Sequence, residues 1–100
     1  SHASIFILNN NYQFVYTNPR SSELFGYSKS ELENRDLRTI VHPDSMNLVL
    51  GNYIKRQQMQ DVPEQYEFKI IRKDQQVRDV EARSSVFIDI QGEIRTVAQL

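Results

Sequence analysis

Hydrophobic and polar residues alternate at both ends of this 100-residue chain, and in the middle they recur at helical spacing. Residues 3–8 are mostly apolar, and residues 12–17 alternate, with Tyr12, Phe14 and Tyr16 in one phase. The asparagines at 9–11 between these runs are typical of a turn. The pattern predicts an N-terminal β-hairpin in which these three aromatic residues share a face.

Two short helices are predicted next from their capping residues. Asn18 is a good N-cap, Pro19 suits the first helical position, and Gly26 offers a C-terminal stop. Ser28 and Glu31 then have the spacing of a capping box, in which each side chain satisfies a backbone donor of the other residue.

A longer helix is predicted to begin at His42-Pro43-Asp44 and to end in a polar segment before Pro63. Its apolar residues recur at helical spacing and predict a single stripe that faces the core. These residues are Met46, Val49, Leu50, Tyr53 and Ile54.

The last third of the chain changes to a period of two, which predicts three strands in a meander. Residues 66–70 and 80–88 alternate on either side of a turn at Asp74-Gln75, and a second turn at Gln91-Gly92 precedes residues 94–100. Two strands, a helical middle and three strands predict an α+β domain with five antiparallel strands and helices on one face. We expect residues 1–100 to form one domain, and we take Ser1 and His2 to be left from an expression tag.

Composition excludes several classes of protein. The chain has no cysteine and a net charge of −1, so neither a disulfide framework nor a basic nucleic-acid surface is expected. The longest apolar run, Ile5 to Leu8, is too short to span a bilayer. No phosphate-binding glycine loop, nucleophile elbow or zinc-protease motif is present, so we expect no enzyme activity from this chain.

Several short motifs, in this order and spacing, resemble the PAS family over essentially the whole chain. They are Asn18-Pro19, Leu24-Phe25-Gly26-Tyr27-Ser28, Glu31-Leu32, Val41-His42-Pro43-Asp44 and Arg72-Lys73-Asp74. The resemblance implies a five-stranded antiparallel sheet in the order 2-1-5-4-3, with helices covering a pocket on one face. Gln75 stands where the family often has glycine, and Ser45 where it often has a second Asp.

The resemblance also implies a function. It predicts a sensory module that regulates an attached effector, above all a histidine kinase, through small-ligand binding or dimer rearrangement. The alternative is a ligand-free dimerisation or relay domain of a cyclic-dinucleotide signalling protein or a transcription regulator. We expect a cytoplasmic homodimer, covalently attached to its effector in a parent protein that can be membrane-anchored, with no nucleic-acid partner and no direct membrane contact by this domain.

The residues that mark the best-known cofactor-binding members are missing. Flavin–cysteine photochemistry needs a thiol, and the chain has none. In haem-binding members a histidine on the long helix is the iron ligand; the matching position falls near Met46, which is more often a core residue. His42 is expected to be a helix-start residue rather than a metal ligand. We therefore expect no tightly bound cofactor, although a small metabolite can fit.

The candidate pocket residues are large apolar or aromatic residues of the predicted inner face, with one small polar residue among them. They are Phe25, Leu37, Met46, Leu50, Tyr53, Tyr66, Phe68 and Ser84. The hydroxyls of Tyr16, Tyr53 and Tyr66 either orient a ligand or reach the surface from the core, and the second reading is favoured. Ser84 either leaves room for a ligand or bonds to a neighbouring backbone group.

The predicted outer face carries fewer candidates. Ile71 and Phe87 are out of phase with the inward set, so they are candidate residues of a dimer interface. Arg72, Lys73, Arg78 and Arg83 are expected to form a solvated face of the sheet.

Overall fold

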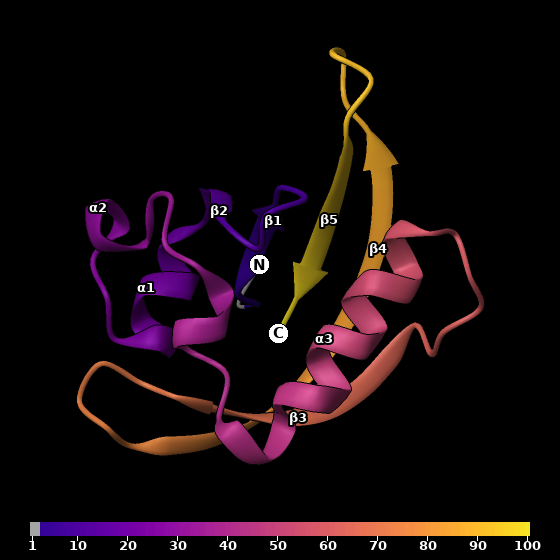
Figure 1. The fold of residues 1–100 in the computed structure, drawn as a ribbon. Coiled ribbons are helices and arrows are strands. Elements are labelled where there is room, and N and C mark those ends of the chain that lie inside the picture. Colours follow the sequence, from indigo (N-terminus) through magenta and orange to yellow (C-terminus); the bar gives the residue numbers. More distant parts are fainter. Residues whose placement is uncertain (1–2) are drawn as a thin grey trace.

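The computed structural model describes residues 3–100, so Ser1 and His2 lie outside the described residues. Figure 1 shows the elements in chain order. They are β1 (Ile5–Leu8), β2 (Phe14–Thr17), α1 (Pro19–Phe25), α2 (Lys29–Leu32), a 3-10 helix η1 (Leu37–Thr39), α3 (Pro43–Gln57), β3 (Gln65–Ile71), β4 (Val77–Ile88) and β5 (Ile94–Gln99).

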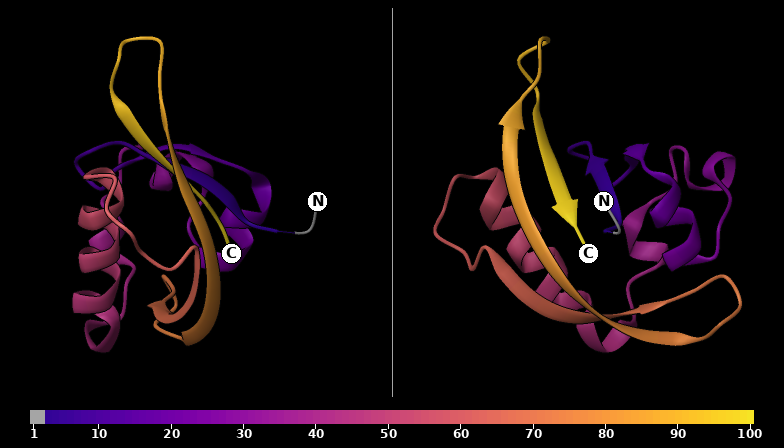
Figure 2. Two further views of the ribbon diagram at one scale, coloured as in Figure 1. Left: turned by 90° about the vertical axis from the view of Figure 1, so that its right-hand side faces the viewer. Right: turned by 180° about the vertical axis from the view of Figure 1, so that it is seen from behind.

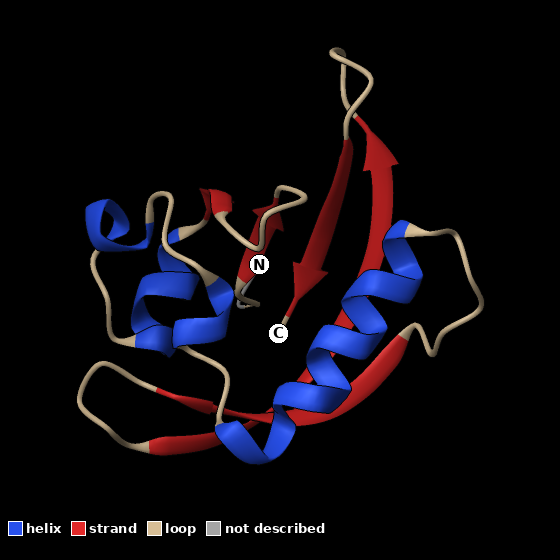
Figure 3. Ribbon diagram, viewed as in Figure 1, coloured by secondary structure: helices blue, strands red, loops and turns tan. Residues whose placement is uncertain are grey.

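The strands form one antiparallel sheet in the order β2-β1-β5-β4-β3, as predicted. The first and last strands are neighbours at its centre, because β1 pairs with β5. Figure 3 shows α3 in front of the long strands and the short helices grouped beside the N-terminal hairpin, and Figure 2 shows α3 on one side of the long β4–β5 hairpin. Helix α3 packs against β3, β4 and β5, whereas α1 and α2 pack against the N-terminal hairpin.

The N-terminal hairpin differs from the predicted alternation at Tyr16. Phe6 pairs with Thr17 and Ile7 with Tyr16, but Leu8 pairs with Phe14, so the register shifts and Val15 is the extra residue. Because a bulge moves the following residue to the other face, Tyr16 is 49% exposed while Thr17 is buried. The prediction that Tyr16 shares a face with Phe14 is therefore wrong.

The helix starts form as their capping residues predict. The Asn18 side chain accepts a hydrogen bond from the Ser21 amide, and Ser28 and Glu31 complete the reciprocal capping box. His42 is the N-cap of α3: its Nδ1 accepts a hydrogen bond of 3.0 Å from the Asp44 amide. This bond gives His42 the structural role that its position before Pro43 predicts.

The buried stripe of α3 is shifted from the predicted one. Ser45, Val49 and Tyr53 are buried at a spacing of four residues, while Ile54 is 44% exposed. The Ser45 hydroxyl accepts a hydrogen bond of 2.9 Å from the Lys69 amide, which ties α3 to β3. A small polar residue that serves the backbone of a neighbouring strand thus occupies a core position that the apolar pattern missed.

Three aromatic rings form the part of the core under α1. Phe6, Phe14 and Phe25 are each at most 2% exposed. The Phe25 ring lies 5.8 Å from that of Phe6 and 5.7 Å from that of Phe14, in tilted and edge-on arrangements that aromatic pairs favour.

Arg72 belongs to the packing of α1 rather than to a solvated face, which corrects its predicted role. Its Nη1 donates hydrogen bonds of 2.7 and 2.6 Å to the carbonyls of Glu23 and Leu24 at the end of the helix. Gly26 follows in the left-handed region with φ of 77°, and a Cβ there would lie 3.3 Å from the Arg72 guanidinium. The β3–β4 turn places Gln75 at φ of 72°, so the glycine that the family often has there is replaced by a strained glutamine.

Candidate ligand pocket

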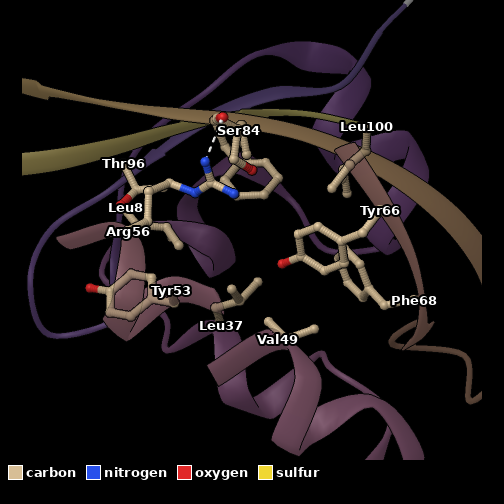
Figure 4. Close-up of a pocket in the computed structure, with 13 residues that line it drawn as sticks. Leu8, Leu37, Val49, Tyr53, Arg56, Tyr66, Phe68, Ser84, Thr96 and Leu100 are labelled. Carbon is tan, nitrogen blue, oxygen red and sulfur yellow. Dashed lines mark hydrogen bonds between the residues drawn. The ribbon is translucent and has the colours of Figure 1, made fainter. Parts of the chain in front are cut away.

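A small pocket lies between α3 and the inner face of the sheet. Its volume is about 30 Å³. Figure 4 shows the side chains that line it. They are Phe6, Leu8, Leu37, Val49, Tyr53, Arg56, Tyr66, Phe68, Ala82, Ser84, Thr96, Ala98 and Leu100.

Five of the predicted pocket residues meet at this site: Leu37, Tyr53, Tyr66, Phe68 and Ser84. The other three do not line it. Phe25 is fully buried in the aromatic cluster under α1, Met46 packs at the edge of the core, and Leu50 is half-buried on α3. Phe25 lies elsewhere because α1 packs against β1 and β2, whereas α3, which covers the pocket, packs against β3, β4 and β5.

Tyr53 presents its ring to the pocket and turns its hydroxyl away from it (Figure 4). That hydroxyl donates to the Asn9 carbonyl and accepts a hydrogen bond of 3.2 Å from the Tyr12 amide. The Tyr12 ring stacks on that of Tyr53 with centroids 4.4 Å apart. Tyr53 therefore fixes the N-terminal turn to α3, and its hydroxyl is already satisfied within the protein.

Tyr66 is the tyrosine whose hydroxyl is directed toward the pocket interior (Figure 4). Burial raises the pKa of Tyr66 above its usual value, and the side chain of Asn52 and the charge of Arg56 oppose that rise. Among residues 3–100, the buried amide nitrogen of Asn52 has no hydrogen-bond partner. The Tyr66 hydroxyl therefore stays protonated at neutral pH and can donate to a ligand.

Arg56 is the charged residue of the pocket lining, and the apolar pattern gave no indication of it. Its Nη1 donates to the Ser84 carbonyl at 3.1 Å and its Nη2 to the Pro63 carbonyl at 2.7 Å. The sequence did hold a signal for this position: Arg56 lies three residues after Tyr53 and seven after Val49, on the buried stripe of α3.

Thr96 also lines the pocket and was missed. It lies in the inward phase of β5, opposite Leu8 on β1 and Val86 on β4, and is 4% exposed. Within residues 3–100 its Oγ1 has no hydrogen-bond partner. Buried hydroxyls without a partner are uncommon and call for an explanation such as a bound water or ligand. Ser84, on the neighbouring strand, offers a second hydroxyl to the same space.

No group of three or more His, Asp or Glu side chains in residues 3–100 could hold a metal ion. None of the helices in that range is long and apolar enough to cross a membrane.

A five-stranded antiparallel sheet with a pocket under helices on one face defines a class of small sensory domains. The family model for the PAS fold matches residues 14–98. The chain belongs to the PAS family, whose members are sensory modules rather than catalytic ones.

Solved structures agree with this fold. A PAS domain from a two-component sensor histidine kinase is 18% identical with a TM-score of 0.81, and the match covers 99% of this chain and 83% of that one. The PAS-B domain of Drosophila melanogaster Cycle with bound ethylene glycol is 16% identical with a TM-score of 0.81, covering 97% of each chain. A sensory box histidine kinase/response regulator from Burkholderia thailandensis is 21% identical with a TM-score of 0.74, covering 98% of this chain and 74% of that one. No curated protein sequence matches the chain.

Proposed function

We propose that this domain is the sensory input module of a larger signalling protein, and that occupancy of the pocket under α3 biases an attached effector. The observation that carries the proposal is the pocket itself, in which a half-buried guanidinium and a buried hydroxyl without a partner among residues 3–100 converge on a mostly apolar space. A concave apolar site with a few convergent polar groups is the usual form of a small-molecule site.

The effector that we propose is a histidine kinase in the cytoplasm. Three of the structural neighbours come from sensor histidine kinases, which supports this choice. A ligand that binds one conformation of the module better than another shifts the balance between them, and an attached kinase can report that shift.

The pocket dimensions support a small ligand rather than a large cofactor. A cavity of roughly 150 Å³ accepts a benzene, and this one is about 30 Å³. The chain has no cysteine for flavin chemistry, and α3 carries no histidine after His42 at its N-cap. These features favour a ligand smaller than haem or flavin, and the Cycle structures hold molecules as small as ethylene glycol and glycerol.

The sensing proposal is tested by following pocket signals in ¹H–¹⁵N NMR spectra of the domain while neutral and charged small molecules are added. Saturable shifts at Thr96, Ala98 and Ser84 are expected for at least one chemical class. If every class leaves these signals in place, the pocket does not sense a diffusible ligand.

A second candidate function is ligand-free dimerisation and relay, which the outer face of the sheet favours. Tyr16, Ile7 and Val97 lie side by side across β2, β1 and β5, with Ser85 of β4 opposite Val97. Phe87, two residues further along β4 on the same face and opposite Arg95, is 41% exposed. Ile71 lies at the far end of the same face, opposite Val77. An exposed apolar row on a sheet is a typical interface between subunits.

This candidate predicts that the domain is a homodimer and that Phe87→Glu converts it to a monomer. Light scattering coupled to size exclusion measures the mass directly. Gln91→Glu is the matched control: it adds the same charge at an exposed residue of the β4–β5 turn, outside this row, so it should leave the mass unchanged. An unchanged mass for Phe87→Glu would exclude this interface.

A further inference from the structure

The only charged side chain on the pocket lining is Arg56, and it has no acidic partner among residues 3–100. Two other arginines with little exposure are paired: Arg72 lies 3.2 Å from Asp74, and Arg95 lies 3.0 Å from Asp89. Arg56 is only partly buried, and its bond to Pro63 is exposed. Unlike Arg72 and Arg95 it has no carboxylate beside it, so an anion can approach its guanidinium without displacing a protein partner.

The hydrogen-bonding capacity of Arg56 is also only partly used. A guanidinium has five N–H donors, and the structure shows one bond to the Ser84 carbonyl and one to the Pro63 carbonyl. Both acceptors are neutral carbonyls, which satisfy donors without compensating the charge. The remaining donors can bind a carboxylate, for which the planar guanidinium is the best-suited side chain.

Donors other than Arg56 face the same space. The Thr96 hydroxyl is more than nine-tenths buried and has no partner within the described chain. The Ser84 and Tyr66 hydroxyls lie on the same lining, while Leu8, Ala82 and Ala98 make the remainder apolar. Hydroxyl donors beside a cation, with an apolar wall opposite, fit an anion that carries a short hydrocarbon group.

We propose that this pocket binds a short-chain carboxylate, such as formate or acetate, with Arg56 as the ion-pair partner and Thr96 as a hydrogen-bond donor. The proposal rests on the sensory function and names its ligand class. A cavity of about 30 Å³ is close to the volume of one water, so even formate or acetate requires the lining side chains to move apart slightly. Longer acids would have to displace side chains that are packed in the core.

The position of Arg56 also gives the ligand a way to act on the fold. Its two hydrogen bonds tie α3 to β4 through Ser84 and to the connector before β3 through Pro63. A bound carboxylate competes for the same guanidinium, so it loosens one of these ties or reorients both. Ser84 and Phe87 both belong to β4, so a change at the Ser84 carbonyl can reach the outer face of the sheet through the same strand.

The test is a titration of the domain with sodium acetate, followed by NMR at the Thr96 and Ser84 amides and at the Arg56 Nε. Acetamide is the neutral control of the same shape, and sodium chloride holds the ionic strength. We expect saturable shifts with acetate alone. Arg56→Gln should weaken acetate binding by roughly tenfold or more, because hydrogen bonds to charged groups contribute about 1.5–3 kcal/mol. Arg83→Gln, which removes an exposed arginine on the other face of β4, should leave it unchanged.

Three outcomes would overturn the proposal: no saturable shift with acetate, acetamide binding as tightly as acetate, or Arg56→Gln binding as tightly as the parent. If Arg56→Gln does not fold, Thr96→Val is tested instead. Thr96→Val keeps Arg56 and should still weaken acetate binding several-fold. An unchanged affinity of Thr96→Val for acetate counts against the proposed site. Ethylene glycol separates this inference from the sensory function. Pocket shifts with ethylene glycol but not with acetate refute the carboxylate and keep the sensor, whereas no shifts with either count against both.

Discussion

Replacing Thr96 with valine should make the ligand-free domain more stable. Thr96 is 4% exposed, and its hydroxyl has no partner among residues 3–100. An unsatisfied buried hydroxyl costs about 1–3 kcal/mol, and the added methyl group contributes up to about 0.8 kcal/mol of burial. Valine and threonine both suit a strand, so backbone propensity does not oppose the gain. We expect the free energy of unfolding to rise by about 1–3 kcal/mol.

Thermal and urea unfolding measure this change. The chain has no tryptophan, so far-UV circular dichroism is the suitable signal. For a domain of this size each kcal/mol shifts the Tm by about 4–8 °C. Thr96→Val should therefore raise the Tm by about 4 °C or more.

Ser21→Ala is the contrasting control. Ser21 is fully buried, and its hydroxyl lies 2.8 Å from that of Ser4 and donates to the Ile5 carbonyl at 3.2 Å. Removing this hydroxyl leaves its buried partners without a hydrogen bond, so the free energy of unfolding of this variant should fall by about 1–3 kcal/mol. If Thr96→Val loses stability as Ser21→Ala does, then the Thr96 hydroxyl is already satisfied, for example by an ordered water, and the reasoning fails.

Three further predictions concern the frame around the pocket. Hydrogen bonds from the Lys73 side chain and the Ser28 amide lower the pKa of Glu31 from 4.5 to about 2. The charge of Glu31 therefore stabilises the fold above pH 4.5, and this contribution is lost as the pH falls toward 2. The difference in unfolding free energy between the parent and Glu31→Gln, measured by urea unfolding, should shrink across this range; a constant difference would show that the charge does not matter. Phe25→Leu should cost about 1–3 kcal/mol because it removes two ring contacts, whereas the same change at exposed Phe87 should cost less than about 0.5 kcal/mol; equal losses in thermal unfolding would contradict the aromatic core. Gly26→Ala should cost at least about 1 kcal/mol, because a left-handed alanine is strained and its Cβ meets the Arg72 guanidinium; an unchanged Tm would refute this.

The sequence predicted best what local chemistry decides. The caps at Asn18, Ser28 and His42 depend on residues within three positions of one another, and all three form. The strand order, by contrast, came from the resemblance to a family, since pairing between β1 and β5 joins residues about ninety positions apart.

The errors have identifiable physical causes. Tyr16 was placed on the wrong face because a bulge depends on how two strands pair, which periodicity within one strand does not reveal. Arg72 looked solvent-facing because its acceptors, the carbonyls of Glu23 and Leu24, are distant in sequence.

The pocket was predicted only in part for a related reason. Its apolar wall follows from strand phase, but its polar groups depend on tertiary contacts. Arg56 bonds to backbone groups 7 and 28 residues away, and whether the Thr96 hydroxyl finds a partner cannot be known until its neighbours are placed. Such unmet polar groups are where local sequence rules fail and where function is to be sought.

The most direct test of the account is a methyl NMR titration that follows Ala82 and Ala98, whose side chains line the pocket, and Ile5 and Ile7, which lie on the outer face. With acetate or ethylene glycol as the probe, the account predicts saturable shifts that begin at the two alanine methyls, with any change at the isoleucines following the same binding curve. Alanine methyl signals that stay fixed at every concentration of both probes, in a domain that remains folded, would contradict the claim that this pocket senses a small ligand.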